Sequence, residues 1–271
     1  MIKLFAPEYQ RTPEGWIIYP SDSEYRKTLF PPEVNQHPAK ANVYLVQSII
    51  EYVSEPGETI MDIMAGTGTI MVGSLIDRSV ICVEISEKFH LLQQRALEKF
   101  EQLAEGVSNN ISLINMPCQT FLPVPEIANH IITSPQYANI IKKSERYELT
   151  DKLTREKQGS YDFTEYAKGV LNLGNMSEFL WTQEMKKVYK KCYESLTSPG
   201  SMTLILKDHI EAGVRVKLCQ MAIDACLEIG FSYDKTEQQK WKAPGMAYTH
   251  IRRARGEITV DDEDIIILRK D

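Results

Sequence analysis

The stretch from Thr59 to Ser86 constrains the fold of this chain more than any other. An apolar run over 60–64 leads into a loop of small residues, 65–69, and a helical pattern follows over 70–76. A second apolar run, 80–83, ends at Glu84. This order predicts a strand–loop–helix–strand unit, which is a building block of α/β sheets.

The small-residue loop is suited to bind a ligand through its backbone. Gly66 and Gly68 permit unusual torsions and close approach, and the helix after them presents free N–H groups at its start. Glu84, at the end of the second strand, has the right chemistry to accept two hydrogen bonds from a ribose diol. The third glycine of the dinucleotide fingerprint and the Gly-Lys-Ser/Thr of a phosphate loop are both missing, so neither of those sites is expected.

Strand and helix patterns alternate along the rest of the chain, which favours a mostly parallel sheet. We expect helices over about 37–53, 86–103, 177–196 and 215–229, and strands over 111–114, 129–133, 202–206 and 264–269. A strand starting within 231–241 would close an antiparallel hairpin at the C-terminal end. Residues 1–36 show no sustained period and are interpreted as an irregular arm. Residues 37–271 form the predicted domain, with 138–177 as a substrate-facing insertion.

Composition excludes several classes of protein. The sequence has no run of about 18 apolar residues and no signal-peptide core, so a cytoplasmic location without a membrane span is expected. The five cysteines are scattered and form no C-x-x-C or His/Cys cluster, which predicts reduced thiols and no metal site. The net charge of −6 leaves nucleic acid open as a partner, because binding requires only a local basic face.

A second motif, Ser134-Pro135-Gln136-Tyr137, follows the predicted strand 129–133. Together with the loop DIMAGTGT over 62–69 and the segment HPAK over 37–40, it resembles the S-adenosylmethionine-dependent methyltransferases that modify exocyclic amino groups of nucleic-acid bases. In that family the loop reads roughly D-P-F-A-G-T/S-G-T and the catalytic tetrapeptide S/N/D-P-P-Y/F/W. The resemblance covers residues 31–137 well and 178–271 more weakly, and it implies a Rossmann-like methyltransferase fold.

The resemblance implies S-adenosylmethionine as cofactor and assigns its contacts. The segment HPAK would help to hold the methionine end. The residues matched to cofactor-binding positions are His37, Ala39, Lys40, Asp62, Ala65, Gly66, Thr67, Gly68, Thr69, Glu84 and Ile85. The family's Gly-Asp pair, whose Asp meets the adenine amine, is replaced here by Asn115-Met116, which leaves the adenine to backbone groups or to Gln119.

The tetrapeptide implies how the methyl group is transferred. The Ser134 hydroxyl and the Pro135 carbonyl would accept the two amine hydrogens, so that the nitrogen lone pair points at the methyl group. Tyr137 would stack on a base flipped out of the duplex. Gln136 replaces the second proline, which removes a fixed φ near the carbonyl but adds an amide that could contact the base. Serine at the first position resembles enzymes that methylate cytosine N4, whereas adenine-N6 enzymes more often have Asn or Asp.

A nucleic-acid surface is predicted in the C-terminal hairpin. Its cations and aromatic residues are Lys240, Lys242, Tyr248, His250, Arg252, Arg253 and Arg255. A solvated hairpin with snorkelling side chains is the alternative. The leading interpretation is a DNA cytosine-N4 methyltransferase, acting alone or as a restriction–modification partner. An adenine-N6 enzyme, an RNA methyltransferase and an inactive cofactor-binding scaffold remain as alternatives.

Overall fold

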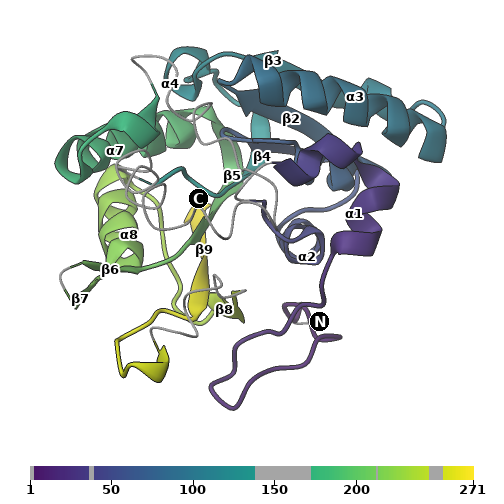
Figure 1. The fold of residues 1–271 in the computed structure, drawn as a ribbon. Helices are drawn as coiled ribbons and strands as arrows, with labels where there is room; N and C mark the ends of the chain where they lie inside the picture. Colours follow the sequence, from purple (N-terminus) through teal and green to yellow (C-terminus); the bar gives the residue numbers. More distant parts are fainter. Residues whose placement is uncertain (1–2, 37–39, 138–171, 212, 244–252) are drawn as a thin grey trace.

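The computed structural model describes residues 3–36, 40–137, 172–211, 213–243 and 253–271 (Figure 1). In these ranges a seven-stranded sheet has the order β3-β2-β1-β4-β5-β9-β8. Five adjacent strands are parallel: β3 (Ile111–Asn115), β2 (Ser79–Glu84), β1 (Thr59–Asp62), β4 (Ala128–Thr133) and β5 (Leu196–Leu206). The last two, β9 (Asp262–Lys270) and β8 (Gln239–Lys242), run antiparallel to their neighbours. The predicted parallel-dominated sheet with an antiparallel C-terminal edge is therefore confirmed.

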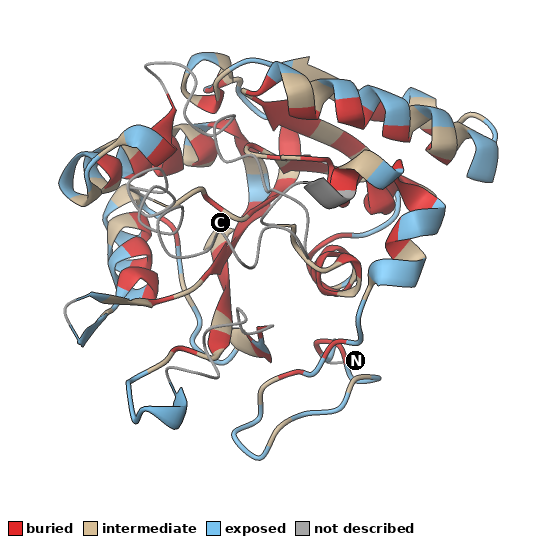
Figure 2. Ribbon diagram, in the orientation of Figure 1, coloured by how far each residue is buried: buried red, intermediate tan, exposed pale blue. Residues whose placement is uncertain are grey.

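Helices cover both faces of the sheet, as the continuous apolar strands require (Figure 2). On one face lie α2 (Val43–Val53), the 3-10 helix η2 (Thr69–Ile76) and α3 (Glu87–Leu103). On the other lie α4 (Cys118–Phe121), α7 (Glu178–Ser195) and α8 (Leu218–Ile229). Strand β9 serves both layers, because Ile265 and Ile267 pack into the first and Ile266 and Leu268 into the second. All four side chains are fully buried.

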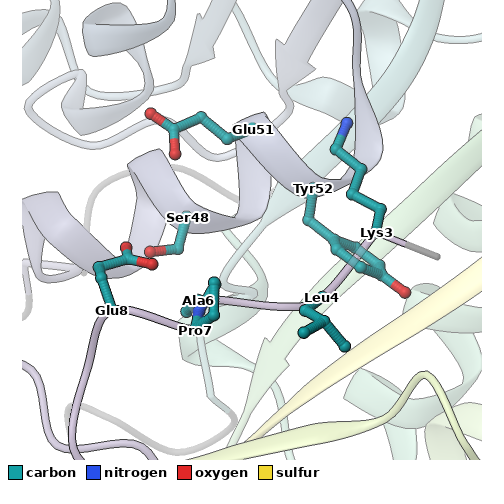
Figure 3. Close-up of a pocket in the computed structure, with 8 residues that line it drawn as sticks. All are labelled: Lys3, Leu4, Ala6, Pro7, Glu8, Ser48, Glu51 and Tyr52. Carbon is teal, nitrogen blue, oxygen red and sulfur yellow. The ribbon is translucent and has the colours of Figure 1, made fainter. Parts of the chain in front are cut away.

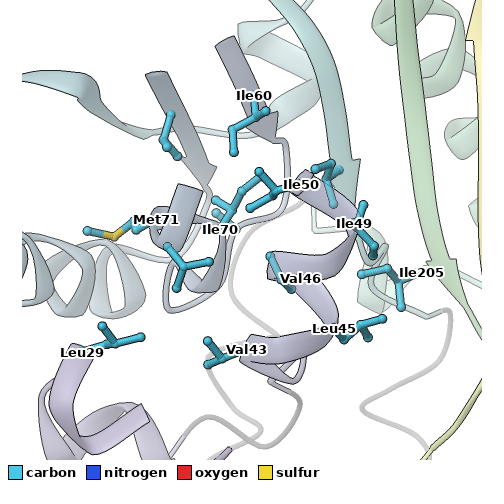
Figure 4. Packing of buried hydrophobic residues seen from close by; sticks show 14 of the residues in the cluster. Leu29, Val43, Leu45, Val46, Ile49, Ile50, Ile60, Ile70, Met71 and Ile205 are labelled. Atoms are coloured by element: carbon cyan, nitrogen blue, oxygen red, sulfur yellow. The ribbon is translucent and has the colours of Figure 1, made fainter. Parts of the chain in front are cut away.

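The first layer holds the glycine-loop unit in place. Figure 4 shows apolar side chains of α2 packed with Ile60 of β1 and with Ile70 and Met71 of η2. The helix predicted over 70–76 is present, although as a 3-10 helix. The helix predicted over 86–103 is confirmed as α3, and Ser86 is its N-cap, because the serine side chain accepts a hydrogen bond from the Phe89 N–H.

The helix predicted from residue 37 begins later. Helix α2 starts at Val43, and the Asn42 side chain accepts hydrogen bonds from the N–H groups of Tyr44 and Leu45. Asn is a strong N-cap, whereas proline in a first turn offers no side-chain acceptor. Residues 37–39 of the HPAK segment lie outside the described residues, and Lys40 precedes the helix.

The prediction of an irregular N-terminal arm is wrong for its second half. Residues 23–29 form α1 (Ser23–Leu29), and Pro32–Gln36 form a 3-10 helix, η1. A helix of two turns is too short to show a periodic pattern in the sequence. The first half of the arm is irregular but buried in part, since Ile17 is fully buried and exchanges backbone hydrogen bonds with Lys240 and Lys242 of β8.

Two further boundaries differ from the prediction. Residues 215–216 belong to β7 (Val214–Val216), which pairs with β6 (His209–Glu211), so α8 starts only at Leu218. Strand β5 starts at Leu196, earlier than the strand predicted from residue 202. No helix in the described ranges is both long and apolar enough to cross a bilayer.

Candidate active site

The fold brings the two sequence motifs to the same edge of the sheet. Strands β1 and β4 are parallel neighbours, with Met61 opposite Ile131. Asp62 ends β1 and starts the glycine loop, while Ser134 directly follows β4. Both motifs therefore leave the carboxyl ends of adjacent strands, which is where ligands bind in open α/β sheets.

The glycine loop is tightly folded and depends on its glycines. Gly66 and Gly68 have φ values of 53° and 82°, in the left-handed region. A Cβ on Gly68 would lie 2.8 Å from the Met71 sulfur. The Gln93 side chain of α3 donates a 2.7 Å hydrogen bond to the Gly66 carbonyl and is fully buried. Gln93, which belongs to none of the sequence motifs, therefore stabilises the loop through its carbonyl. Ala65, Thr67 and Thr69 of the loop are also buried.

Two acids stand at the ends of β1 and β2. Asp62 accepts a 3.0 Å hydrogen bond from the Met64 N–H, and burial raises the pKa of Asp62 to about 6. The Glu84 carboxylate accepts 2.7 Å hydrogen bonds from the N–H groups of Gly66 and Ser86. Burial, with a smaller contribution from the Asp62 charge, raises the pKa of Glu84 to about 7. Glu84 is thus a buried carboxylate linked to the glycine loop, with capacity for further donors.

Two polar residues, Asn115 and Gln119, lie at and after the end of β3, in the region where the family described above has its aspartate. The Asn115 amide, at the end of β3, donates to the carbonyls of Glu84 at 2.9 Å and of Ile85 at 3.4 Å. Gln119 follows in α4 and is half-buried. Asn115 therefore fixes the backbone of the Glu84–Ile85 segment rather than standing free.

The tetrapeptide is held by two other elements. Trp181 of α7 donates a 2.6 Å hydrogen bond to the Gln136 carbonyl. The Gln136 side-chain amide packs against Gly174, where an added Cβ would lie only 2.6 Å from the amide nitrogen. The Tyr137 hydroxyl accepts a 2.8 Å hydrogen bond from the Lys207 N–H at the end of β5. Burial raises the pKa of Tyr137 well above its usual value, so the hydroxyl stays neutral. Pro135 is buried and Ser134 half-buried.

Some of the cations in the predicted nucleic-acid surface are already paired with aspartates of this chain. Lys240 forms ion pairs with Asp262 and Asp264, and Arg253 pairs with Asp261 at 2.5 Å. Lys242 and Arg255 are exposed. Trp241, which stands between Lys240 and Lys242 in the sequence, is buried in the first layer and donates to Glu263. Tyr248, His250 and Arg252 lie outside the described residues, as does most of the predicted insertion, 138–171.

A cavity and a cluster of two carboxylates and a histidine lie among other residues than those of the predicted site. A cavity of about 260 Å³ lies between residues 3–8 of the arm and α2 (Figure 3), and no predicted site residue lines it. Glu178, His209 and Glu211 bring ligand atoms within 4.8 Å of one another. The His209 Nε2 lies 4.0 and 3.9 Å from the two carboxylates, wider than the roughly 3.3 Å between ligands of a tetrahedral zinc ion.

Comparison with known proteins relates the first third of the chain to one family. The model of a DNA methylase family matches residues 6–95, which include most of the arm, the glycine loop and both acids but not the tetrapeptide. No curated protein has a significantly similar sequence.

Solved structures share the fold at low identity. TrmN from Thermus thermophilus is 15% identical over 91% of this chain and 53% of its own, with a TM-score of 0.52. A methyltransferase from Pyrococcus furiosus is 15% identical over 92% and 94%, with a TM-score of 0.50. The cyclopropane synthase MmaA2 from Mycobacterium tuberculosis is 12% identical over 84% of both chains, with a TM-score of 0.52. The chain thus spans about half the length of TrmN. It has the Rossmann-like fold of S-adenosylmethionine-dependent methyltransferases, and S-adenosylmethionine is the cofactor of that class, as predicted.

Proposed function

We propose that this protein transfers a methyl group from S-adenosylmethionine to an exocyclic amine of a DNA base, with cytosine N4 as the target. The observation that carries the proposal is the position of Ser134-Pro135-Gln136-Tyr137. It follows β4 at the sheet edge where the glycine loop leaves the neighbouring strand β1. A methyl donor on the loop and an amine on the tetrapeptide would therefore be held side by side.

The residues at the ends of β1 and β2 fit the cofactor. When bound, S-adenosylmethionine supplies an electrophilic methyl group. Glu84 is a buried carboxylate with free acceptor capacity for a ribose diol, and the left-handed φ values of Gly66 and Gly68 hold the backbone of the loop against it. Asp62 and the 65–69 loop form the rest of this cradle, with Ile85 beside the adenine. We assign Lys40, with His37 and Ala39, to the methionine end.

The tetrapeptide supplies the acceptors that the chemistry needs. An exocyclic amine is a weak nucleophile because its lone pair is delocalised into the ring. The Ser134 hydroxyl and the Pro135 carbonyl would accept its two hydrogens and stabilise the positive charge that develops on nitrogen. Tyr137 is anchored through its hydroxyl on Lys207, which fixes the ring that would stack on the base. The hydrogen bond from Trp181 to the Gln136 carbonyl provides rigidity that a second proline would otherwise give.

DNA contacts are assigned to the exposed cations of the hairpin and to the 138–177 insertion. Lys242 and Arg255 are exposed, and Tyr248, His250 and Arg252 join them in the sequence. Lys240 and Arg253 are the weaker candidates, because a phosphate would have to displace aspartates from their side chains. Restriction–modification and stand-alone roles both fit this assignment.

A methyl-transfer assay tests the proposal. Labelled S-adenosylmethionine is offered with unmethylated DNA and, separately, with total RNA, and the products are digested to nucleosides for mass spectrometry. We expect N4-methylcytosine in DNA. N6-methyladenine would support the mechanism but contradict cytosine as the target base. Label in RNA alone would contradict DNA as the substrate. Bound cofactor without any transfer would support the inactive scaffold.

A pair of serine variants separates catalysis from folding. Ser134→Ala should reduce turnover about tenfold or more while cofactor affinity stays within about twofold. Ser112→Ala, on the exposed side of β3, is the matched control and should leave both unchanged. Equal turnover in Ser134→Ala would remove the assigned role of its hydroxyl.

A further inference from the structure

Arg26, in the N-terminal arm, connects three segments that meet beside the glycine loop. The side chain is only 4% exposed. Its guanidinium donates to the Asp22 carboxylate at 2.6 and 3.1 Å, to the Ala41 carbonyl at 2.5 Å and to the Thr69 hydroxyl at 3.2 Å. Ala41 follows Lys40, and Thr69 ends the glycine loop. Arg26 therefore bonds to the glycine loop and to the residue that directly follows the HPAK segment.

One donor of this buried guanidinium remains available. Arginine carries five N–H groups, and four of them are used in the hydrogen bonds to Asp22, Ala41 and Thr69. The second N–H on Nη1 has no partner among the residues that the structure describes.

Arg26 and Lys40 lie close enough for their charges to act on each other. Lys40 is half-buried, and its pKa is lowered by burial and then by the Arg26 charge. Asp22, which bonds to Arg26 and to the Val43 N–H, offsets part of this repulsion. An anionic ligand close to both cations would offset more of it.

We infer that Arg26 is a second cation, beside Lys40, for the carboxylate at the methionine end of the cofactor. The N-terminal arm would then be part of the cofactor site rather than an appendage. Asp22 would act as a positioning residue that orients the guanidinium, so that the remaining N–H on Nη1 can donate to the carboxylate. The inference rests on the proposed function, since it names a residue for the same cofactor.

Two ligands that differ at one end distinguish this role from a structural one. S-adenosylhomocysteine carries the amino-carboxyl end, whereas 5′-methylthioadenosine lacks it and keeps the adenosine and the thioether. Dissociation constants for both would be measured by calorimetry on the full chain. In Arg26→Gln we expect the constant for S-adenosylhomocysteine to rise about tenfold or more and that for 5′-methylthioadenosine to change less than about twofold.

The variants are chosen so that each outcome is decisive. Lys27→Gln, on the exposed side of α1, is the matched control and should bind both ligands as the native chain does. Should Arg26→Gln fail to fold, Arg26→Lys keeps the charge without the fork and should still lower the preference for S-adenosylhomocysteine. An equal loss for both ligands, or no loss, overturns the inference and leaves Arg26 as a brace for the loop. A native chain that binds neither ligand contradicts the proposed function itself.

Discussion

Glu84 should make cofactor binding depend on pH near neutrality. Its carboxyl group accepts two backbone N–H groups and, in the proposed complex, the ribose diol, which requires the ionised form. With a pKa of about 7, the ionised fraction is about 0.1 at pH 6 and about 0.9 at pH 8. The affinity for S-adenosylhomocysteine should therefore rise about tenfold between pH 6 and pH 8.

The free energy of unfolding should fall, rather than rise, as Glu84 ionises with increasing pH. The pKa of Glu84 is raised in the folded state, so the folded chain holds the proton more tightly than the unfolded chain. Its contribution to stability is therefore greatest below the unfolded pKa of about 4.3 and is lost as pH rises through about 7. The total change is on the order of 3 kcal/mol, at about 1.4 kcal/mol per pH unit.

Calorimetric titrations at pH 6, 7 and 8, with urea unfolding at the same pH values, measure both trends. Glu84→Gln removes the ionisable group, so its affinity should be lower and nearly flat over this range. Asp62, with a pKa of about 6, is expected to leave a smaller residual slope. A native affinity that is flat, or that falls between pH 6 and pH 8, would refute the assignment of Glu84 to the ribose.

Three further substitutions test the surroundings of the site. Trp181→Phe removes the donor to the half-buried Gln136 carbonyl and should cost about 1 kcal/mol in urea unfolding and lower turnover, with cofactor affinity kept; unchanged turnover would show that this carbonyl needs no anchor. Gly174→Ala places a Cβ 2.6 Å from the Gln136 amide and should raise the KM for DNA without changing cofactor affinity; an unchanged KM would separate Gln136 from the base pocket. Burial lowers the pKa of His130, despite its contact with Glu58, so the native chain should lose up to about 1.4 kcal/mol per pH unit as pH falls below about 6.5. His130→Gln should lack this component in acid unfolding, and identical pH slopes for the two proteins would rule it out.

The parts of the fold that could be predicted are those encoded by neighbouring residues. The apolar run, small-residue loop and second run around Gly66 are local, and so the unit was recognisable without a structure. The helices predicted from residues 86 and 177 begin with caps that are also local, because Ser86 and Ser177 each accept a hydrogen bond from a backbone N–H three residues ahead. The alternation of such units was enough to predict the parallel sheet.

The residues that brace the site could not be found in the same way. Arg26 meets Thr69 across 43 positions, Trp181 meets Gln136 across 45, and Gln93 meets Gly66 across 27. The separations between these partners match no helical or strand periodicity, so the sequence pattern does not reveal them. Each contact depends on how the helices pack on the sheet. The ion pairs of Lys240 could not be predicted for a related reason, because its aspartate partners lie more than 20 residues away in β9.

The position of β9 has a consequence for how the chain matures on the ribosome. This strand lies between β5 and β8, both of which precede it in the chain. Until β9 has emerged, β5 presents an unpaired edge along most of its length, from Gly200 to Leu206. An open, apolar edge of this kind invites pairing with other chains. Chaperone protection during synthesis should therefore matter most in the interval between translation of β5 and translation of β9.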